Sequence, residues 1–315
     1  MGMLYSNTDR SFFMIGAIIV AGLVIGLLVT VIGGDFSNGL SGAVNGLFDT
    51  ADAVITGGHS NPNGGAGTDE GSPSDPYTVA TDSDFNFIPD SFGDMTVGGE
   101  KGYFAYVGSD TYVRVPDVIQ GVTLTSMRRM FMGTSVEGVA VNNPVITSMY
   151  ETFKDVTASA LDLSSFYTPG VTEISGMFEG LTLTAALDLS QFDTSNVVRM
   201  MSMFEGYNGP TVDLTAFDFT SVTHLTDIFK DATTPTILFP STVAPNQSYY
   251  VVGWFQNATI PTLDLTSFDF TNMDSTTFNA FTGATIDAIY VKNASVKTRV
   301  MSMHGFPSTT TVTIK

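Results

Sequence analysis

The 315-residue sequence predicts an α+β fold in which a long N-terminal hydrophobic α-helix precedes a repeat-built solenoid head with short parallel strands. Residues 11–34 carry no charged side chain, residues 57–76 are rich in Gly, Ser, Pro and Asn, and a phrase ending in Phe recurs seven times after residue 125. Recurrence at a fixed period of about 25 residues is typical of stacked structural repeats. We expect six segments: an N-terminal flank (1–10), a hydrophobic then amphipathic helix (11–56), a linker (57–76), a lead-in with the N-terminal cap (77–118), the repeats (119–291) and a C-terminal cap (292–315).

The predicted helix begins with an apolar stretch of 24 residues. At ~1.5 Å per residue it is long enough to cross a hydrocarbon core of ~30 Å. Beyond Gly34 the apolar residues recur at spacings of three and four, which places them on one face of a helix. The residues expected to line a filament core or a membrane span are Phe12, Ile15, Ile18, Val24, Leu27, Val31, Phe36, Leu40, Val44 and Leu47.

The run GGDFSNGLSGAVNGLF, which follows the apolar stretch, resembles the short type IVb (Flp/Tad-type) pilins. The resemblance covers roughly the first 55 residues and implies a homopolymer whose core is bundled helices, with a membrane-inserted precursor. Those pilins place a glutamate near the start of the mature helix, whereas no acidic residue occurs here between Arg10 and Asp35. A single-pass membrane anchor that never polymerises is the alternative.

The segment after the helix predicts an acidic, solvated spacer. Residues 57–76 form a flexible linker of ~25 Å root-mean-square span. Further on, Asp82, Asp84, Asn86 and Asp90 resemble the start of a calcium loop, but Phe87 occupies the sixth position, where the loop requires Gly. Whether calcium binds there is left open.

The repeats are the strongest pattern in the sequence. Seven Phe residues recur at steps of 22 to 26, at positions 131, 153, 178, 204, 229, 255 and 281. A second column follows ten residues later, or eleven in the third unit, at Val141, Leu163, Leu189, Leu214, Phe239, Leu265 and Val291, and a third at Phe166, Phe192, Phe217 and Phe268. Alternation along Leu-Asp-Leu predicts a strand with both Leu side chains inside and the Asp outside. Trp254 shares a column with Met130, Met177 and Met203, so we expect it in the core.

Residues 172–206 (TEISGMFEGLTLTAALDLSQFDTSNVVRMMSMFEG) resemble the BspA-type leucine-rich repeats of bacterial surface proteins. The resemblance extends over residues 100–315 and implies a leucine-rich-repeat solenoid without catalytic activity, displayed for recognition and often adhesion. The last residues, from Ile289, resemble that family's terminal cap of strand, short helix and closing strand, and residues 104–127 look like its opening hairpin.

The composition restricts the partners and the chemistry. The chain has 12 Lys+Arg against 31 Asp+Glu, a net charge of −19, so nucleic acid is not an expected partner. With no Cys and three scattered His, no cofactor or metal centre is expected, and we predict that the protein is not an enzyme. An enzyme that uses paired Asp carboxylates on a sugar is the remaining alternative, which activity lost in Asp188→Asn or Asp213→Asn would support.

Two features of the repeats predict a ligand or interface patch. In the fifth unit Leu238 replaces the outward Asp, and Tyr249 and Tyr250 follow nearby. The outward row of Asp162, Asp188, Asp213 and Asp264 could attract cations or a basic partner, and a merely solubilising face is the alternative. Three N-x-S/T triplets begin at Asn246, Asn257 and Asn293.

Taken together, the sequence predicts a pilin-like subunit of an extracellular filament, with a leucine-rich-repeat head that binds an unknown cell-surface ligand. The alternative is a membrane-anchored surface adhesin. Changing Leu40, Val44 and Leu47 to Ser distinguishes them, because only a filament depends on that apolar face.

Overall fold

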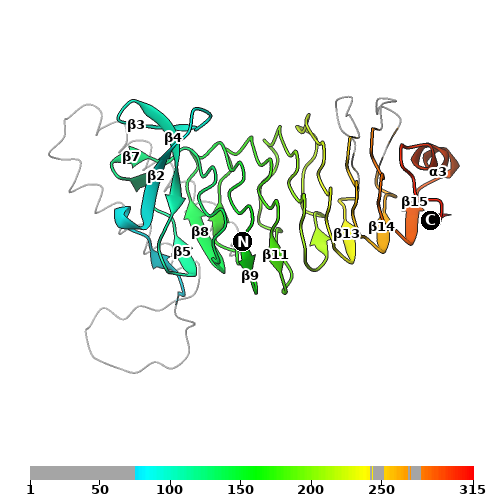
Figure 1. Ribbon diagram of the computed structural model, residues 1–315, viewed down its shortest axis with the longest axis horizontal. Coiled ribbons are helices and arrows are strands. Elements are labelled where there is room, and N and C mark those ends of the chain that lie inside the picture. Colours follow the sequence, from blue (N-terminus) through cyan, green and yellow to red (C-terminus); the bar gives the residue numbers. More distant parts are fainter. Residues whose placement is uncertain (1–74, 242, 244–251, 269, 271–277) are drawn as a thin grey trace, which may run out of the picture. The chain divides into compact units, whose positions relative to one another are not determined.

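The computed structural model describes residues 75–241, 243, 252–268, 270 and 278–315. The chain divides into two compact units, Met1–Pro73 and Ser74–Lys315, and every described residue belongs to the second. This unit is a β-solenoid, whose coils follow one another from cyan to red in Figure 1.

The predicted α+β fold class is wrong. The described residues contain one α-helix, α3 (Ala294–Met301), and are otherwise short strands and turns that bond from coil to coil. The long hydrophobic helix was expected at residues 11–56, which lie outside the described residues. The prediction took its helical class from that apolar segment, whereas the repeats satisfy their backbone groups by parallel pairing between coils.

Across the described ranges, no helix is both long enough and apolar enough to cross a membrane.

The N-terminal cap is a small antiparallel sheet ordered β2-β4-β3, with a separate β6-β7 pair. Its elements are β1 (Thr78–Val79), the 3-10 helix η1 (Asp82–Asp84), β2 (Phe85–Pro89), β3 (Met95–Val97), β4 (Glu100–Tyr106), β6 (Val118–Ile119) and β7 (Val122–Thr123). Within residues 104–127, where an opening hairpin is expected, β6 and β7 pair antiparallel, with Val118 opposite Thr123. β4 pairs with β2 and β3, whereas β5 (Tyr112–Arg114) pairs in parallel with β1 and β8. Buried Val113 gives β5 the inside-outside pattern of a repeat strand, so it joins the solenoid sheet.

The coils contribute strands of two to five residues. They are β8 (Gly138–Asn142), β9 (Thr157–Ala158), β10 (Phe166–Tyr167), β11 (Thr182–Leu183), β12 (Val212–Asp213), β13 (Thr236–Leu238), β14 (Thr262–Asp264), β15 (Ala288–Val291) and β16 (Thr311–Ile314). The sheet orders are β1-β5-β8-β10, β9-β11 and β12-β13-β14-β15-β16, all parallel.

One register in the second column differs from the prediction. Val141 pairs with Phe166, and Asp162 pairs with Gly138, so Val141 does not align with Leu163. The first coil is shorter than the others by about three residues, and counting ten residues from each Phe therefore places its strand two positions too late.

The core is a ladder of stacked Phe rings. All seven Phe residues of the first column are at most 2% exposed, and their ring centroids lie 5.3 to 5.9 Å apart from coil to coil. Tyr106 packs on the first ring and Phe306 on the last, which closes the ladder at both caps. Trp254 is 2% exposed, so its predicted core position is confirmed.

Each coil turns at its Phe through two residues with positive φ. They stand two positions before the Phe, at 129, 151, 176, 202, 227, 253 and 279, and two positions after it, at 133, 155, 180, 206, 231, 257 and 283. Through this turn every second N–H group donates to the next coil, as Phe131 N–H does to the Thr152 carbonyl at 3.0 Å, whereas the N–H groups of Met130 and Met132 donate within their own coil. At Gly180, where φ is +67°, a Cβ would lie 2.2 Å from Asp155 Oδ1, so glycine both adopts the positive φ without strain and leaves room for that side chain.

The C-terminal cap agrees with the expectation of a strand, a short helix and a closing strand. After β15, Asn293 Oδ1 accepts the Val296 N–H at 2.9 Å and begins α3 as a side-chain cap. Val296 and Val300 bury one face of the helix, and β16 then pairs with β15.

Candidate binding face

The outward positions of successive strands form one row along the solenoid, called here the strand-face row. Strand pairing places these positions side by side from coil to coil. The row consists of Tyr77, Tyr112, Gly138, Asp162, Asp188, Asp213, Leu238, Asp264 and Tyr290. It contains all four predicted aspartates and Leu238, so the structure brings these candidate residues together.

Each of these aspartates accepts a hydrogen bond from its own chain. Oδ1 of Asp162, Asp188, Asp213 and Asp264 lies 2.9 Å from the backbone nitrogen two residues later. This is the turn that Asp favours before Ser or Thr. The backbone hydrogen bond from Ser190 lowers the pKa of the Asp188 carboxyl, so that carboxylate is ionised at neutral pH. Part of the reason for the recurring Asp is therefore turn chemistry, which the charge-based interpretation missed.

The second carboxylate oxygen is occupied at the two ends of the aspartate series. The Tyr77 hydroxyl donates to Asp162 Oδ2 at 2.9 Å across Gly138, where a Cβ would lie 2.5 Å from the Tyr112 ring. Burial and the hydrogen bond to Asp162 raise the pKa of Tyr77, so it stays a donor. At the other end Lys315 Nζ lies 3.3 Å from Asp264 Oδ2.

The two middle aspartates differ from the outer ones. Within the described part of the chain, no side chain donates to Oδ2 of Asp188 or Asp213. Beside them lies a hollow of about 310 Å³, lined also by Ala186, Ser190, Thr215 and Ala216. The arrangement offers two unpaired carboxylate oxygens, two hydroxyl groups and small apolar side chains, which suits a ligand that donates hydrogen bonds.

A second hollow lies beside the first, on the side of the C-terminal cap. It measures about 250 Å³ and shares Thr215 with the first. Leu238, 39% exposed, lines it together with Asp264, while Phe239 turns inwards and packs edge-on against Phe268 with centroids 4.7 Å apart. Tyr249, Tyr250 and the triplet at Asn246 lie outside the described residues.

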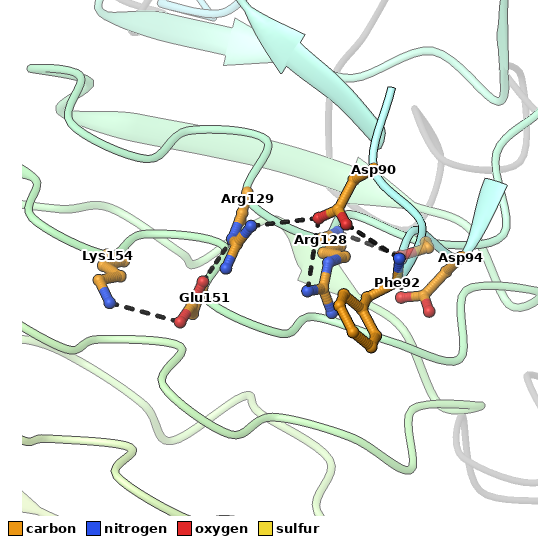
Figure 2. A network of polar contacts seen from close by, with 8 residues as sticks. Asp90, Phe92, Asp94, Arg128, Arg129, Glu151 and Lys154 are labelled. Atoms are coloured by element: carbon orange, nitrogen blue, oxygen red, sulfur yellow. Dashed lines mark hydrogen bonds and ion pairs between the residues drawn. The ribbon is translucent and has the colours of Figure 1, made fainter. Parts of the chain in front are cut away.

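Figure 2 shows an ion-pair network on the opposite, turn side of the coils, which the sequence analysis missed. Asp90 Oδ2 lies 3.2 Å from Arg129 Nη1, Arg129 Nε donates to Glu151, and Lys154 Nζ lies 3.3 Å from Glu151 and 2.7 Å from Glu179. The network fastens the N-terminal cap to the first three coils. A signal existed, since Arg129 and Glu151 hold the same place in consecutive repeats.

The carboxylates of the calcium-loop-like segment each contact a partner within the protein. Asp82 Oδ1 accepts the Gln120 N–H at 2.6 Å, Asp84 Oδ2 accepts the Thr81 N–H at 2.7 Å, and Asp90 faces Arg129. The three carboxylates are thus directed at three different partners, and in the described ranges no three acidic or His side chains are grouped as metal ligands.

The other two N-x-S/T triplets take part in local structure. Asn257 Nδ2 donates to Asp231 Oδ1 at 2.9 Å, and the Asn293 side chain caps α3. Both asparagines therefore have structural roles whether or not a glycan is attached.

Residues 147–237 match the family model described as "Mycoplasma protein of unknown function, DUF285". No curated protein matches the chain. No solved structure matches it either. The family match and the stacked parallel strands fit a repeat-built surface protein in general.

Proposed function

We propose that the solenoid is a non-catalytic recognition module, displayed at the cell surface, whose strand-face row binds an adhesion partner. The observation that carries the proposal is the pair of middle aspartates, Asp188 and Asp213, each with an unpaired carboxylate oxygen beside the larger hollow. The BspA-like character of the repeats is part of the proposal, because the matched family model has no assigned function.

The chemistry of the row favours an extended partner that donates hydrogen bonds. Carboxylates and threonine hydroxyls accept bonds from sugar hydroxyls or amines, and the two hollows are neighbours because Thr215 lines both. The apolar Leu238 supplies a contact in the second hollow. A linear glycan that carries hydroxyl and amino groups has this chemistry along its whole length.

Binding is better supported than acid/base catalysis at the same residues. A glycosidase pair needs one carboxyl whose pKa is raised so that it can act as the acid. The pKa of Asp188 is instead lowered by its backbone hydrogen bond from Ser190. The carboxylate therefore suits an acceptor of hydrogen bonds.

The filament role and the membrane-anchor alternative depend on residues 11–56, outside the described residues, and stay predictions. The triple Ser change at Leu40, Val44 and Leu47 tests them by electron microscopy of material sheared from expressing cells. Filaments that contain the protein and vanish in the variant support the polymer, whereas protein found only in the membrane fraction supports the anchor.

The binding proposal is tested on an array of neutral and amino-sugar glycans, probed with the purified full chain. The double variant Asp188→Asn/Asp213→Asn keeps the Oδ1 acceptors that close the local turns but removes both charges. We expect its signal on the bound glycans to fall at least about tenfold, since each charged hydrogen bond contributes about 1.5–3 kcal/mol.

The matched control is Asp110→Asn/Asp117→Asn, which removes the same charge from exposed residues of the N-terminal region. Its signal should equal that of the wild type. Equal signals from all three proteins would remove the middle aspartates from the binding face and with them the proposal.

A further inference from the structure

The two ends of the solenoid carry opposite charge. Residues 278–315 contain four Lys or Arg and one acidic residue, a net charge of +3, although the chain as a whole has a net charge of −19. Residues 75–118 contain eight acidic residues and two basic ones, a net charge of −6. We name these segments the basic end and the acidic end, and Figure 1 shows them at opposite ends of the described solenoid.

Exposed apolar side chains are concentrated at the same two ends. Of the twelve large hydrophobic side chains that are exposed in the described residues, eight lie in these segments. The acidic end holds Val79, Ile88, Phe92, Val107 and Val118, and the basic end holds Phe278, Met301 and Ile314. Each end segment thus carries exposed apolar side chains together with net charge of one sign, the two kinds of group that protein interfaces combine.

The strand order places complementary edges at these ends. β1 is the first strand of its sheet and β16 the last of its own, and both run parallel to their neighbours. Asp82 and Asp84 follow β1, and Asp75, whose carboxylate pairs with Arg114 at 2.7 Å, precedes it. Lys297 Nζ lies on the outer strand β16, 2.7 Å from the Val312 carbonyl oxygen. Positive charge therefore stands at one outer edge and negative charge at the other.

We propose that the basic end docks the acidic end of a second copy of this chain, head to tail. The occupant follows from charge complementarity, because the chain itself supplies an acidic surface at the opposite end of the same elongated body. A contact between two different surfaces of identical subunits leaves one of the two surfaces unused on each partner. Further copies can bind there, so the solenoids link into rows. The contact uses residues other than the strand-face row and does not rest on the proposed function.

The test is cysteine cross-linking of the full chain, which has no Cys of its own. The protein is kept in non-ionic detergent. One preparation carries Val79→Cys and the other Ile314→Cys, both at exposed positions of the edge strands, and a short bismaleimide links them. We expect a dimer band from the mixture at 50 mM NaCl that falls at least about fivefold at 500 mM, because salt screens the charges. The Ile314→Cys preparation alone should give little dimer.

Charge reversal makes the test specific. Lys292→Glu/Arg299→Glu in the Ile314→Cys chain should reduce the band about tenfold, and so should Asp75→Lys/Asp82→Lys in the Val79→Cys chain. Mixing the two reversed chains should restore it. The control Ala185→Glu/Gln191→Glu adds negative charge at exposed positions of the central coils, outside the ion pairs, and should leave the band unchanged.

Three outcomes would overturn the proposal: a mixed band insensitive to salt, reversed chains that fail to restore the band although circular dichroism shows both folded, or equal linking in every combination. The salt series needs no reversed chain, so it tests the docking even if a charge variant does not fold. None of these outcomes bears on glycan binding.

Discussion

The strand side and the turn side of the solenoid both carry charged residues at positions that recur from coil to coil. The bonding partners of these charged residues differ between the two sides. On the strand side the aspartates bond to their own backbone two residues later. On the turn side the charged groups pair with the next coil, as Arg129 does with Glu151 and Lys230 with Glu205. The hydrogen bonds of the strand side form within one coil, whereas the ion pairs of the turn side require two stacked coils.

The difference shows what repetition allows. A local turn can recur unchanged in every coil, because the aspartate and the backbone N–H that it accepts from belong to the same coil. A bond between coils needs opposite charges in neighbouring units, so the sequence of the turn side must vary from coil to coil. We therefore expect substitutions on the turn side to cost more than those on the strand side, and the following three predictions test this order.

The largest effect is expected at Glu151, whose side chain is 8% exposed between Arg129 and Lys154. Changing Glu151→Gln keeps the shape but leaves both cations without their shared anion. We expect the free energy of unfolding to fall by about 2 kcal/mol at pH 7, measured by urea denaturation. Glu100→Gln makes the same chemical change at an exposed position and should alter it by less than about 0.5 kcal/mol.

Lowering the pH should reduce the difference in free energy of unfolding between Glu151→Gln and the wild type. Burial alone would raise the pKa of Glu151, but the Arg129 hydrogen bond and the charges of Lys154 and Arg129 outweigh it, and the pKa is lowered. A lowered pKa adds stability above the unfolded value of about 4.3, and this is lost as the pH falls through the folded value. A gap that stays constant from pH 7 to pH 3 would contradict this origin.

The strand side should respond more weakly, and in a way that separates the turn from the charge. Asp188→Ala removes the acceptor of the Ser190 N–H and should lower the free energy of unfolding by about 1 kcal/mol. Asp188→Asn keeps an oxygen in the same place and should stay within about 0.5 kcal/mol of the wild type. If Ala and Asn give equal losses, the charge rather than the turn stabilises this position.

The same distinction explains how much of the molecule could be predicted. The Phe ladder, the outward aspartates and the buried Trp254 are carried by signals that recur within each unit, and the structure places them as expected. The closing cap was likewise predictable, because strand, helix and strand are each marked by their own residues.

The errors fall where the structure depends on partners far along the chain. Nothing within one unit shows that Asp90 meets Arg129 across 39 positions. The shortened first coil displaced Val141 for the same reason. The α+β class was predicted from residues 11–56, which lie outside the described residues, and it does not describe the repeats that make up the described fold.

The smallest effect, with the opposite sign, is expected at Asp227, which holds the same place in its coil as Glu151 does in its own. Burial raises the pKa of Asp227, the charges of Glu205 and Asp231 add to this, and Lys230 only partly opposes it. Lys230 already pairs with Glu205, so Asp227 lacks a cation of its own. Asp227→Asn removes this penalty and keeps a residue that tolerates positive φ, so we expect a gain of about 0.5 kcal/mol at pH 7.

The pH dependence distinguishes this gain from a general effect of removing charge. A raised pKa adds stability that is fully present below the unfolded value and is lost as the pH rises through the folded value. The advantage of Asp227→Asn should therefore disappear on acidification below about pH 4, where the wild-type carboxyl is protonated. Glu151→Gln and Asp227→Asn would then converge on the wild type from opposite sides as the pH falls. If both variants instead destabilise the protein at pH 7, neighbouring coils satisfy Asp227 as they do Glu151, and the contrast within the turn side is wrong.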